Sequence, residues 1–260
     1  MTNDSAFSLS NENGLVVLNF NLPEALRDIF SVKLFGRGAA MDAAQGNPEK
    51  SWLAVKTPEL PDVKLIAPYQ VHGTAVLPAH EIYAWPTRPQ ADGIFLTQAA
   101  KACGSLRFAD CTPVIIAGTK PRPWMLLLHS GYVGTVKDIS GTALAREIER
   151  GTIDLSGETW AWIAPSICPK CYSRKKDGDL STTNGLAVFD RANYEDKGSL
   201  VFFDIQSQIA LQLERAGLAK NRIFTMRRCT HCEHGFFYSY RGGDLLSRNF
   251  LLACATKASL

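Results

Sequence analysis

Six short apolar runs, most of them bounded by glycine, proline or polar residues, constrain the fold of this 260-residue chain more than any other feature. Each run is five to seven residues long, which suits a β-strand and is too short for a membrane-spanning helix. Most of the runs are rich in β-branched and aromatic side chains, which favour pleated sheets. We therefore predict strands over residues 14–20, 93–97, 113–118, 124–129, 159–164 and 235–240.

Two other segments repeat their apolar residues with the period of a helix. Residues 136–150 place five apolar side chains on one face: Val136, Ile139, Ala143, Leu144 and Ile148. Residues 204–218 begin with Asp204 as a predicted N-cap and end at Gly217, and their apolar face carries Ile205, Ile209 and Leu213. Two stretches rich in Gly, Asn, Asp and Ser, residues 37–51 and 174–185, indicate loops.

The predicted strands and helices are mixed along the chain without strict alternation. An α/β or α+β domain with a large, partly mixed sheet therefore fits better than a doubly wound fold. The composition, 46% hydrophobic and 20% charged, is typical of a soluble globular protein. No internal repeat or low-complexity linker indicates a domain boundary.

The charge balance and the N-terminal residues exclude several classes of protein. A net charge of +3, from 28 basic and 25 acidic residues, is too balanced to indicate nucleic-acid or membrane binding. The N-terminus has no basic segment followed by a long apolar one, so it does not resemble a signal peptide. We expect a cytoplasmic protein, in which the seven cysteines stay reduced and clustered cysteines serve metal binding or catalysis.

Cys111 and two histidines form the first candidate site. His72 lies before a glycine in "QVHG", Cys111 follows "GSLRFAD", which we also predict to be a strand, and His129 ends the strand "WMLLLH". Zinc accepts one thiolate and two imidazoles in a tetrahedral arrangement and leaves a fourth position for water. The gaps of 39 and 18 residues do not by themselves distinguish this ligand set from a buried cysteine and two hydrogen-bonded histidines.

Two Cys-x-x-Cys pairs form a rival metal site. "CPKC" contributes Cys168 and Cys171, and "CTHC" contributes Cys229 and Cys232, with His231 and His234 as further possible ligands. Such pairs are typical of structural zinc sites, although the 57 residues between them exceed the usual spacing. A group of free thiols is the alternative.

The segment "HSGYVGTVKD" is a predicted strand–loop–helix junction. Backbone amides of Gly131, Tyr132 and Gly134 at the start of the helix are candidates for binding an anion, and an ordinary tight turn is the alternative. Asp92 precedes a glycine and a strand, so it is a turn residue or a carboxylate directed at the site. Asp110 neighbours Cys111, and we expect it to organise the turn, because adjacent side chains of an extended segment face opposite ways. Candidate anion partners are Lys33, Arg37 and Arg241.

Taken together, these motifs resemble a known family. "QVHGTAV", "ADGIFLT", "FADCTPV", "HSGYVG", "APSICPKCYSR" and "RCTHCEHGFFYSYR" occur in the order found in the laccase-domain (multicopper polyphenol oxidase-like) family. Bacterial members of that family are also described as purine nucleoside phosphorylases. The resemblance covers residues 14–255, nearly the whole chain.

The resemblance implies a fold, a metal and an activity. It implies one domain over residues 1–260 with four layers, α/β/β/α, similar to the catalytic domain of cytotoxic necrotizing factor. It implies zinc bound by His72, Cys111 and His129, with copper as the less favoured metal. The implied activities are phosphorolysis of adenosine, inosine, guanosine and methylthioadenosine, and deamination of adenosine. The position of Asp92 makes it our candidate for proton transfer.

The chain departs from the family pattern where phosphate is expected to bind. The usual "HAGWRG" is "HSGYVG" here, which places Tyr132 at the tryptophan and Val133 at the arginine. Lys33 replaces an arginine of the family's "FSTR", and Ser173 replaces a glutamate. Valine supplies no cation for phosphate and lysine lacks the bidentate fork of arginine, so these replacements weaken the case for phosphorolysis.

Three other functions compete with a zinc-dependent nucleoside enzyme. A copper-dependent polyphenol oxidase needs histidine-rich sites for several coppers, and five histidines in the whole chain are few for that. A zinc- and nucleoside-binding protein with a degraded active site would fit the changes at Val133 and Ser173. A thiol hydrolase would need Cys111 as a metal-free nucleophile beside a histidine.

Overall fold

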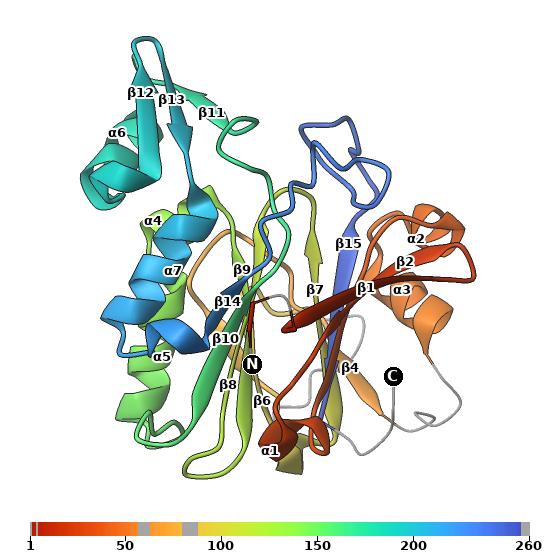
Figure 1. Ribbon diagram of the computed structural model, residues 1–260. Coiled ribbons are helices and arrows are strands. Elements are labelled where there is room, and N and C mark those ends of the chain that lie inside the picture. Colours follow the sequence, from red (N-terminus) through yellow and green to blue (C-terminus); the bar gives the residue numbers. More distant parts are fainter. Residues whose placement is uncertain (1, 4, 57–62, 80–87, 256–260) are drawn as a thin grey trace.

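Two six-stranded sheets lie face to face in the computed structural model (Figure 1), which describes residues 2–3, 5–56, 63–79 and 88–255. The first sheet is antiparallel except for its last pair, β7 and β4. Its strands, in spatial order, are β1 (Phe7–Glu12), β2 (Leu15–Phe20), β3 (Ser31–Phe35), β15 (Asn249–Cys254), β7 (Ala102–Phe108) and β4 (Lys64–Ile66).

The second sheet is antiparallel at its centre and has a parallel pair at each edge. Its order is β14 (Ile223–Thr225), β10 (Thr159–Ile163), β8 (Thr112–Gly118), β9 (Trp124–Ser130), β6 (Gly93–Thr97) and β5 (Val76–Pro78). A small third sheet contains β11 (Ser173–Lys175), β13 (Leu200–Phe203) and β12 (Tyr194–Lys197). The prediction of a mixed α/β domain built on large sheets is confirmed.

Helices cover the outer faces of the two large sheets (Figure 1). On the second sheet lie α4 (Tyr132–Val136), α5 (Ile139–Glu149) and α7 (Ile205–Arg215). Beside the first sheet lie α2 (Ala39–Ala44) and α3 (Pro48–Val55), and α6 (Leu180–Val188) accompanies the small sheet. The remaining helical segments are α1 (Glu24–Arg27) and the 3₁₀ turns Gln98–Ala100, Arg191–Asn193 and Lys220–Arg222. Within the described residues, no helix has the length and apolarity that crossing a membrane requires.

The apolar runs are buried on both faces, which explains why they lack the alternation of a half-exposed strand. In β8, Ile115 and Ala117 pack into the core between the two sheets, whereas Val114 and Ile116 pack under the helices. Five of the six predicted strands, all except 235–240, are observed with bounds shifted by no more than one residue. Strand 235–240 is wrong: Tyr238 is fully buried, but its N–H donates to the Asn249 side chain rather than to a neighbouring strand.

Capping residues account for most differences between the predicted and observed helices. Asp204 caps α7 as predicted, and its side chain accepts a hydrogen bond from Ser207 N. The helix predicted over 136–150 is observed as α5, which begins three residues later, at Ile139, because Asp138 adopts a left-handed conformation and caps it. Val136 ends the separate helix α4. The two predicted loops are wrong. The first contains α2 and the start of α3, and the second contains the start of α6, since Asn47 and Asp179 cap helices there instead of forming turns.

One pair of cysteines contradicts the expectation that all seven are reduced. Cys103 and Cys254 face each other across the antiparallel pair β7–β15 and form a disulfide. The other five cysteines are free thiols.

Candidate active site

His72, Cys111 and His129 come together at one end of the two sheets. Cys111 lies in the turn between β7 and β8, His129 lies on β9, and His72 lies in the loop between β4 and β5. Their potential ligand atoms are all within 4.8 Å of one another, and Cys111 Sγ is 3.8 Å from His72 Nε2. The first predicted ligand set is therefore close enough to bind one metal ion.

Hydrogen bonds to Asp92 hold the backbone at His72 and the imidazole ring of His129 in place. Its carboxylate accepts hydrogen bonds from the N–H groups of Val71 (3.1 Å), His72 (3.0 Å) and Gly73 (2.6 Å). His72 has φ of 58°, a conformation that costs a non-glycine residue about 1–3 kcal/mol, so these three bonds stabilise a strained backbone. The same carboxylate lies 2.8 Å from Nδ1 of His129, which leaves Nε2 of that ring for a metal.

The buried environment sets the charge of these groups. Burial alone would raise the pKa of Asp92, but the hydrogen bonds from His129, Gly73 and Val71 lower it below its usual range, so the carboxylate is ionised. Burial lowers the pKa of His129, which favours the neutral ligand form. Burial, with Asp110 and Asp92 adding to it, raises the pKa of the Cys111 thiol to about 12. Without a metal this thiol is not an activated nucleophile, which disfavours a thiol hydrolase.

The three ligands line a cavity of about 640 Å³, within the size range of small-molecule sites. Four arginines and three tyrosines share its lining: Arg88, Arg107, Arg241, Arg248, Tyr69, Tyr172 and Tyr240. The cavity is therefore both cationic and aromatic.

The guanidinium group of Arg107, in the cavity lining, has a buried nitrogen without a hydrogen-bond partner. Its Nη2 donates to Pro68 O at 2.6 Å, but the buried Nη1 has no partner within the described part of the chain. Burial lowers the pKa of Arg107 to about 9, and the charges of Arg88 and Arg248 contribute. A buried donor surrounded by cations is a position at which an anionic or electron-rich ligand would be stabilised.

The other predicted site residues occupy different positions. Arg241 lines the cavity, and its backbone N–H donates to Asp110 at 2.7 Å. Lys33 is not in the cavity lining; it lies on β3 and forms an ion pair with Glu12 at 3.8 Å. Asp110 has φ of 82° in the turn before Cys111, and its carboxylate binds both Arg241 N and the Thr230 hydroxyl. Asp110 thus organises the turn, as its position predicts.

The three residues of the expected anion loop are packed beneath the ligands. Gly131 touches Cys111, whose Sγ would clash with any side chain at this position. Tyr132 is buried against Tyr172 and Phe203, and its hydroxyl donates to Ser181 O. A β-carbon on Gly134 would lie 3.3 Å from the carbonyl of His129. These residues support the ligands, and none of them lines the cavity.

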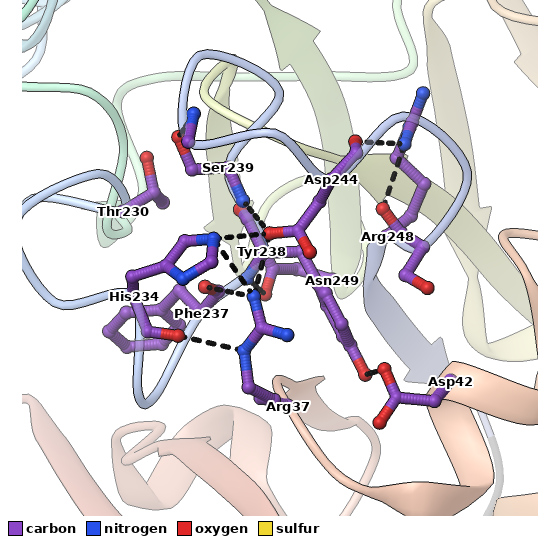
Figure 2. Close-up of polar contacts among 12 residues, drawn as sticks. Arg37, Asp42, Thr230, His234, Phe237, Tyr238, Ser239, Asp244, Arg248 and Asn249 are labelled. Atoms are coloured by element: carbon purple, nitrogen blue, oxygen red, sulfur yellow. Dashed lines mark hydrogen bonds and ion pairs between the residues drawn. The ribbon is translucent and has the colours of Figure 1, made fainter.

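A polar network holds the C-terminal loop that supplies Arg241 and Arg248 (Figure 2). Arg37 donates to Asp244 Oδ2 at 2.6 Å and to His234 O at 2.7 Å, so its guanidinium is already engaged. His234 Nε2 lies 2.8 Å from the same Asp244 oxygen. Arg248 donates to Asp244 O, which connects this network to the cavity. Arg37 and His234 therefore have structural positions rather than the anion- and metal-binding ones expected.

The second predicted metal site is also assembled. Sγ atoms of Cys168, Cys171, Cys229 and Cys232 lie within 4.8 Å of one another, in two loops next to the cavity. Sequence patterns located both groups of potential metal ligands. They did not locate Arg88, Arg107 or Arg248, which sit in segments far apart in the chain and meet only in the folded state.

Known proteins of similar sequence carry nucleoside-related names. Purine nucleoside phosphorylase YlmD of Geobacillus stearothermophilus is 29% identical over 155 residues, 59% of this chain and 55% of the relative. The alignment thus spans about half of that relative. Purine nucleoside phosphorylase slr1573 of Synechocystis is 29% identical over 206 residues, 70% of this chain and 76% of the relative. Adenosine deaminase RL5, from an unknown prokaryote, is 25% identical over 142 residues, 51% of this chain and 50% of the relative.

Solved structures share the fold over almost the full length. The crystal structure of YlmD from Geobacillus stearothermophilus superposes with a TM-score of 0.77 at 19% identity, covering 96% of this chain and 99% of that one. A Bacillus licheniformis protein, YfiH, gives 0.74 at 17% identity, covering 95% and 98%. The model of the family described as multi-copper polyphenol oxidoreductase laccase matches residues 40–248, and the chain therefore belongs to that family.

Proposed function

We propose that this chain is a zinc-dependent enzyme that cleaves purine nucleosides by phosphorolysis in the cavity lined by His72, Cys111 and His129. The carrying observation is that a complete set of two imidazoles and one thiol opens onto a cavity of nucleoside size that is rich in arginine. The names of the relatives YlmD and slr1573 support the same class of substrate.

The donor set fits zinc. One soft thiolate with two imidazoles is a combination that zinc binds, with a position left open for a substrate or water. Asp92 holds His129 by Nδ1 and so presents Nε2, and Gly131 leaves room beside Cys111 because it has no side chain. Bound there, zinc would supply a Lewis acid next to the substrate.

Cavity arginines supply the cations that Val133 does not. Val133 packs among the apolar residues under the helices, so phosphate has no partner at that position. Arg107 offers an unpaired N–H, and Arg241 and Arg248 line the same cavity. In phosphorolysis a phosphate oxygen forms a bond to ribose C1′ while the bond from C1′ to the purine nitrogen breaks, and the leaving base takes up a proton. Arginine forks would bind the phosphate and stabilise its charge during this exchange.

Tyrosines are suited to bind the purine, since aromatic side chains stack on bases. Tyr69 and Tyr172 are each accompanied by an arginine, with Arg88 5.7 Å and Arg241 5.2 Å from the ring centroids. Asp92 is fully buried and both of its oxygens already accept hydrogen bonds, so we assign it a positioning role rather than proton transfer.

Deamination of adenosine is the second candidate, supported by the relative named adenosine deaminase RL5. In that reaction water adds to C6 of the purine and ammonia leaves, without phosphate. Purified zinc-loaded protein is incubated with adenosine and with inosine, with and without phosphate. Phosphorolysis predicts free base and ribose 1-phosphate only when phosphate is present, whereas deamination converts adenosine to inosine in either case.

Control variants and binding measurements distinguish phosphorolysis from the remaining candidate functions. Arg107→Met should slow cleavage at low phosphate concentration by about tenfold or more, while Arg215→Ala, which removes an exposed arginine paired with Asp190, should not. No turnover of either nucleoside, with binding retained in calorimetry, would instead support a binding protein. A copper oxidase is disfavoured by ligand chemistry: the two groups of potential metal ligands among the described residues are two histidines with a cysteine, and four cysteines.

A further inference from the structure

The four cysteines outside the cavity are placed as ligands of one ion. Cys168 and Cys171 lie in the loop between β10 and β11, and Cys229 and Cys232 lie in the loop after β14. Their sulfurs lie within 4.8 Å of one another, and those of Cys171 and Cys232 are 3.4 Å apart. We propose that these four cysteines bind a structural zinc ion, separate from the one at His72, Cys111 and His129, and that it joins the two loops that support the cavity wall.

Backbone geometry favours a thiolate at Cys229 and gathers the other pair of cysteines. Cys229 Sγ accepts hydrogen bonds from Cys168 N at 3.2 Å, across the two loops, and from Cys232 N at 3.4 Å, within its own. In the other loop, the N–H groups of Cys171 and Tyr172 both donate to the carbonyl of Cys168, which forms the tight turn that brings a Cys-x-x-Cys pair to one point. Hydrogen bonds donated to sulfur are strongest when the sulfur is charged, as it is in a zinc site.

Packing alone does not account for the cluster. A core cysteine behaves as a small apolar side chain and is buried, but Cys232 is exposed and Cys168 and Cys171 are only partly buried. All four cysteines are free thiols in the structure. A tetrahedral ion uses all four sulfurs, whereas a single disulfide would leave two of them unexplained. Four protein ligands also leave no open position, which is the pattern of a structural rather than a catalytic zinc.

The cluster is connected to the cavity by two short paths. Tyr172, which lines the cavity, directly follows Cys171. Thr230 directly follows Cys229, and its hydroxyl donates to Asp110 at 2.7 Å, next to Cys111. Zinc at the four cysteines would therefore fix the position of a cavity tyrosine and of the turn that carries a ligand of the other site.

Metal counting tests the proposal without requiring any turnover, so its result is independent of the nucleoside activity. Zinc-reconstituted protein should hold about two ions per chain, and Cys111→Ala and the double variant C171S/C232S should each hold about one. After cobalt substitution, Cys111→Ala should keep the intense absorption of a tetrathiolate centre, and the double variant should lose it. Equal zinc content in the double variant and the wild type would overturn the proposal.

A second measurement uses the wild-type protein, in case the double variant does not fold. Iodoacetamide is applied with and without prior treatment with a chelator, and the labelled cysteines are mapped by mass spectrometry. The proposal expects Cys168, Cys171, Cys229 and Cys232 to be protected together in the zinc-loaded protein and labelled together after chelation. Labelling of these four before chelation, or a disulfide joining Cys171 to Cys232 in the zinc-loaded protein, would contradict it.

Discussion

Asp92→Asn is the change that most directly tests how the first metal site is held. The carboxylate accepts four hydrogen bonds of 2.6–3.1 Å, two on each oxygen. An asparagine of the same shape keeps one oxygen and replaces the other with an NH₂ group. Two of the four donors then face another donor inside a fully buried site.

The size of the effect follows from those two lost acceptors. A buried donor left without a partner costs about 1–3 kcal/mol, so Asp92→Asn should lower the free energy of unfolding by about 2–6 kcal/mol. Either orientation of the amide disturbs a ligand. With the NH₂ group in place of Oδ2, the N–H groups of Val71 and Gly73 on either side of His72 lose their acceptor. With it in place of Oδ1, the His72 N–H and the His129 ring lose theirs. Loss of such a supporting group costs about 10–100-fold in metal affinity.

Urea unfolding and a zinc competition titration measure the two quantities. Asp190→Asn is the matched control, because this exposed carboxylate also accepts a backbone N–H and pairs with an arginine but lies away from the site. The control should change the free energy of unfolding by less than about 1 kcal/mol. If Asp92→Asn matches the wild type in both stability and zinc affinity, the assignment of Asp92 as the group that positions the ligands is refuted.

Three other substitutions test the cavity and its scaffold. Gly131→Ala would place a methyl group against Cys111, so zinc content at that site should fall by about tenfold or more while the four-cysteine site keeps its ion; metal analysis after dialysis would show this. Arg107→Met should weaken phosphate binding by about tenfold or more without lowering the melting temperature, because the buried guanidinium is held among other cations; calorimetry with phosphate and thermal melting are the two readouts. Asp244→Asn tests the loop network: burial alone would raise the pKa of Asp244, but the Ser239 N–H and Arg37 lower it, so its stabilising effect is present above about pH 4 and is lost as the pH falls through its lowered value. The difference in unfolding free energy between Asp244→Asn and the wild type should therefore shrink in acid, and a difference that is constant with pH would count against the network.

Strand prediction succeeded where burial is complete. Runs such as 93–97 and 113–118 are apolar throughout because both faces are covered, and the flanking turns mark their ends. The same criterion failed at 235–240, since a buried aromatic segment can satisfy its backbone through a side chain such as Asn249. Polar residues at 37–51 were misread because Asn favours both turns and helix N-caps, and only tertiary packing decides between them.

The proximity of the potential metal ligands could be predicted because each is a single distinctive residue in a short motif. His72, Cys111 and His129 each occur in such a motif, and the structure brings them together. The cationic residues of the cavity could not be predicted in this way, because Arg107 on β7 and Arg248 directly before β15 are far apart in the sequence and are brought together only by the pairing of these two strands. The opposite error occurs at Lys33. Its motif predicts an anion partner in the site, but its position on β3 places it in an ion pair with Glu12 and outside the cavity lining.

The position of β15 has a consequence for the order in which the protein can be built during synthesis. This strand, Asn249–Cys254, pairs with β3 on one side and β7 on the other, so it fills the centre of the first sheet. Until the ribosome has released residue 254, β3 and β7 have no neighbour between them, and the inter-sheet core lacks Leu251 and Ala253. Contacts so distant in sequence form slowly. The second sheet, complete by residue 225, can therefore assemble first and serve as the surface on which the other half of the fold closes.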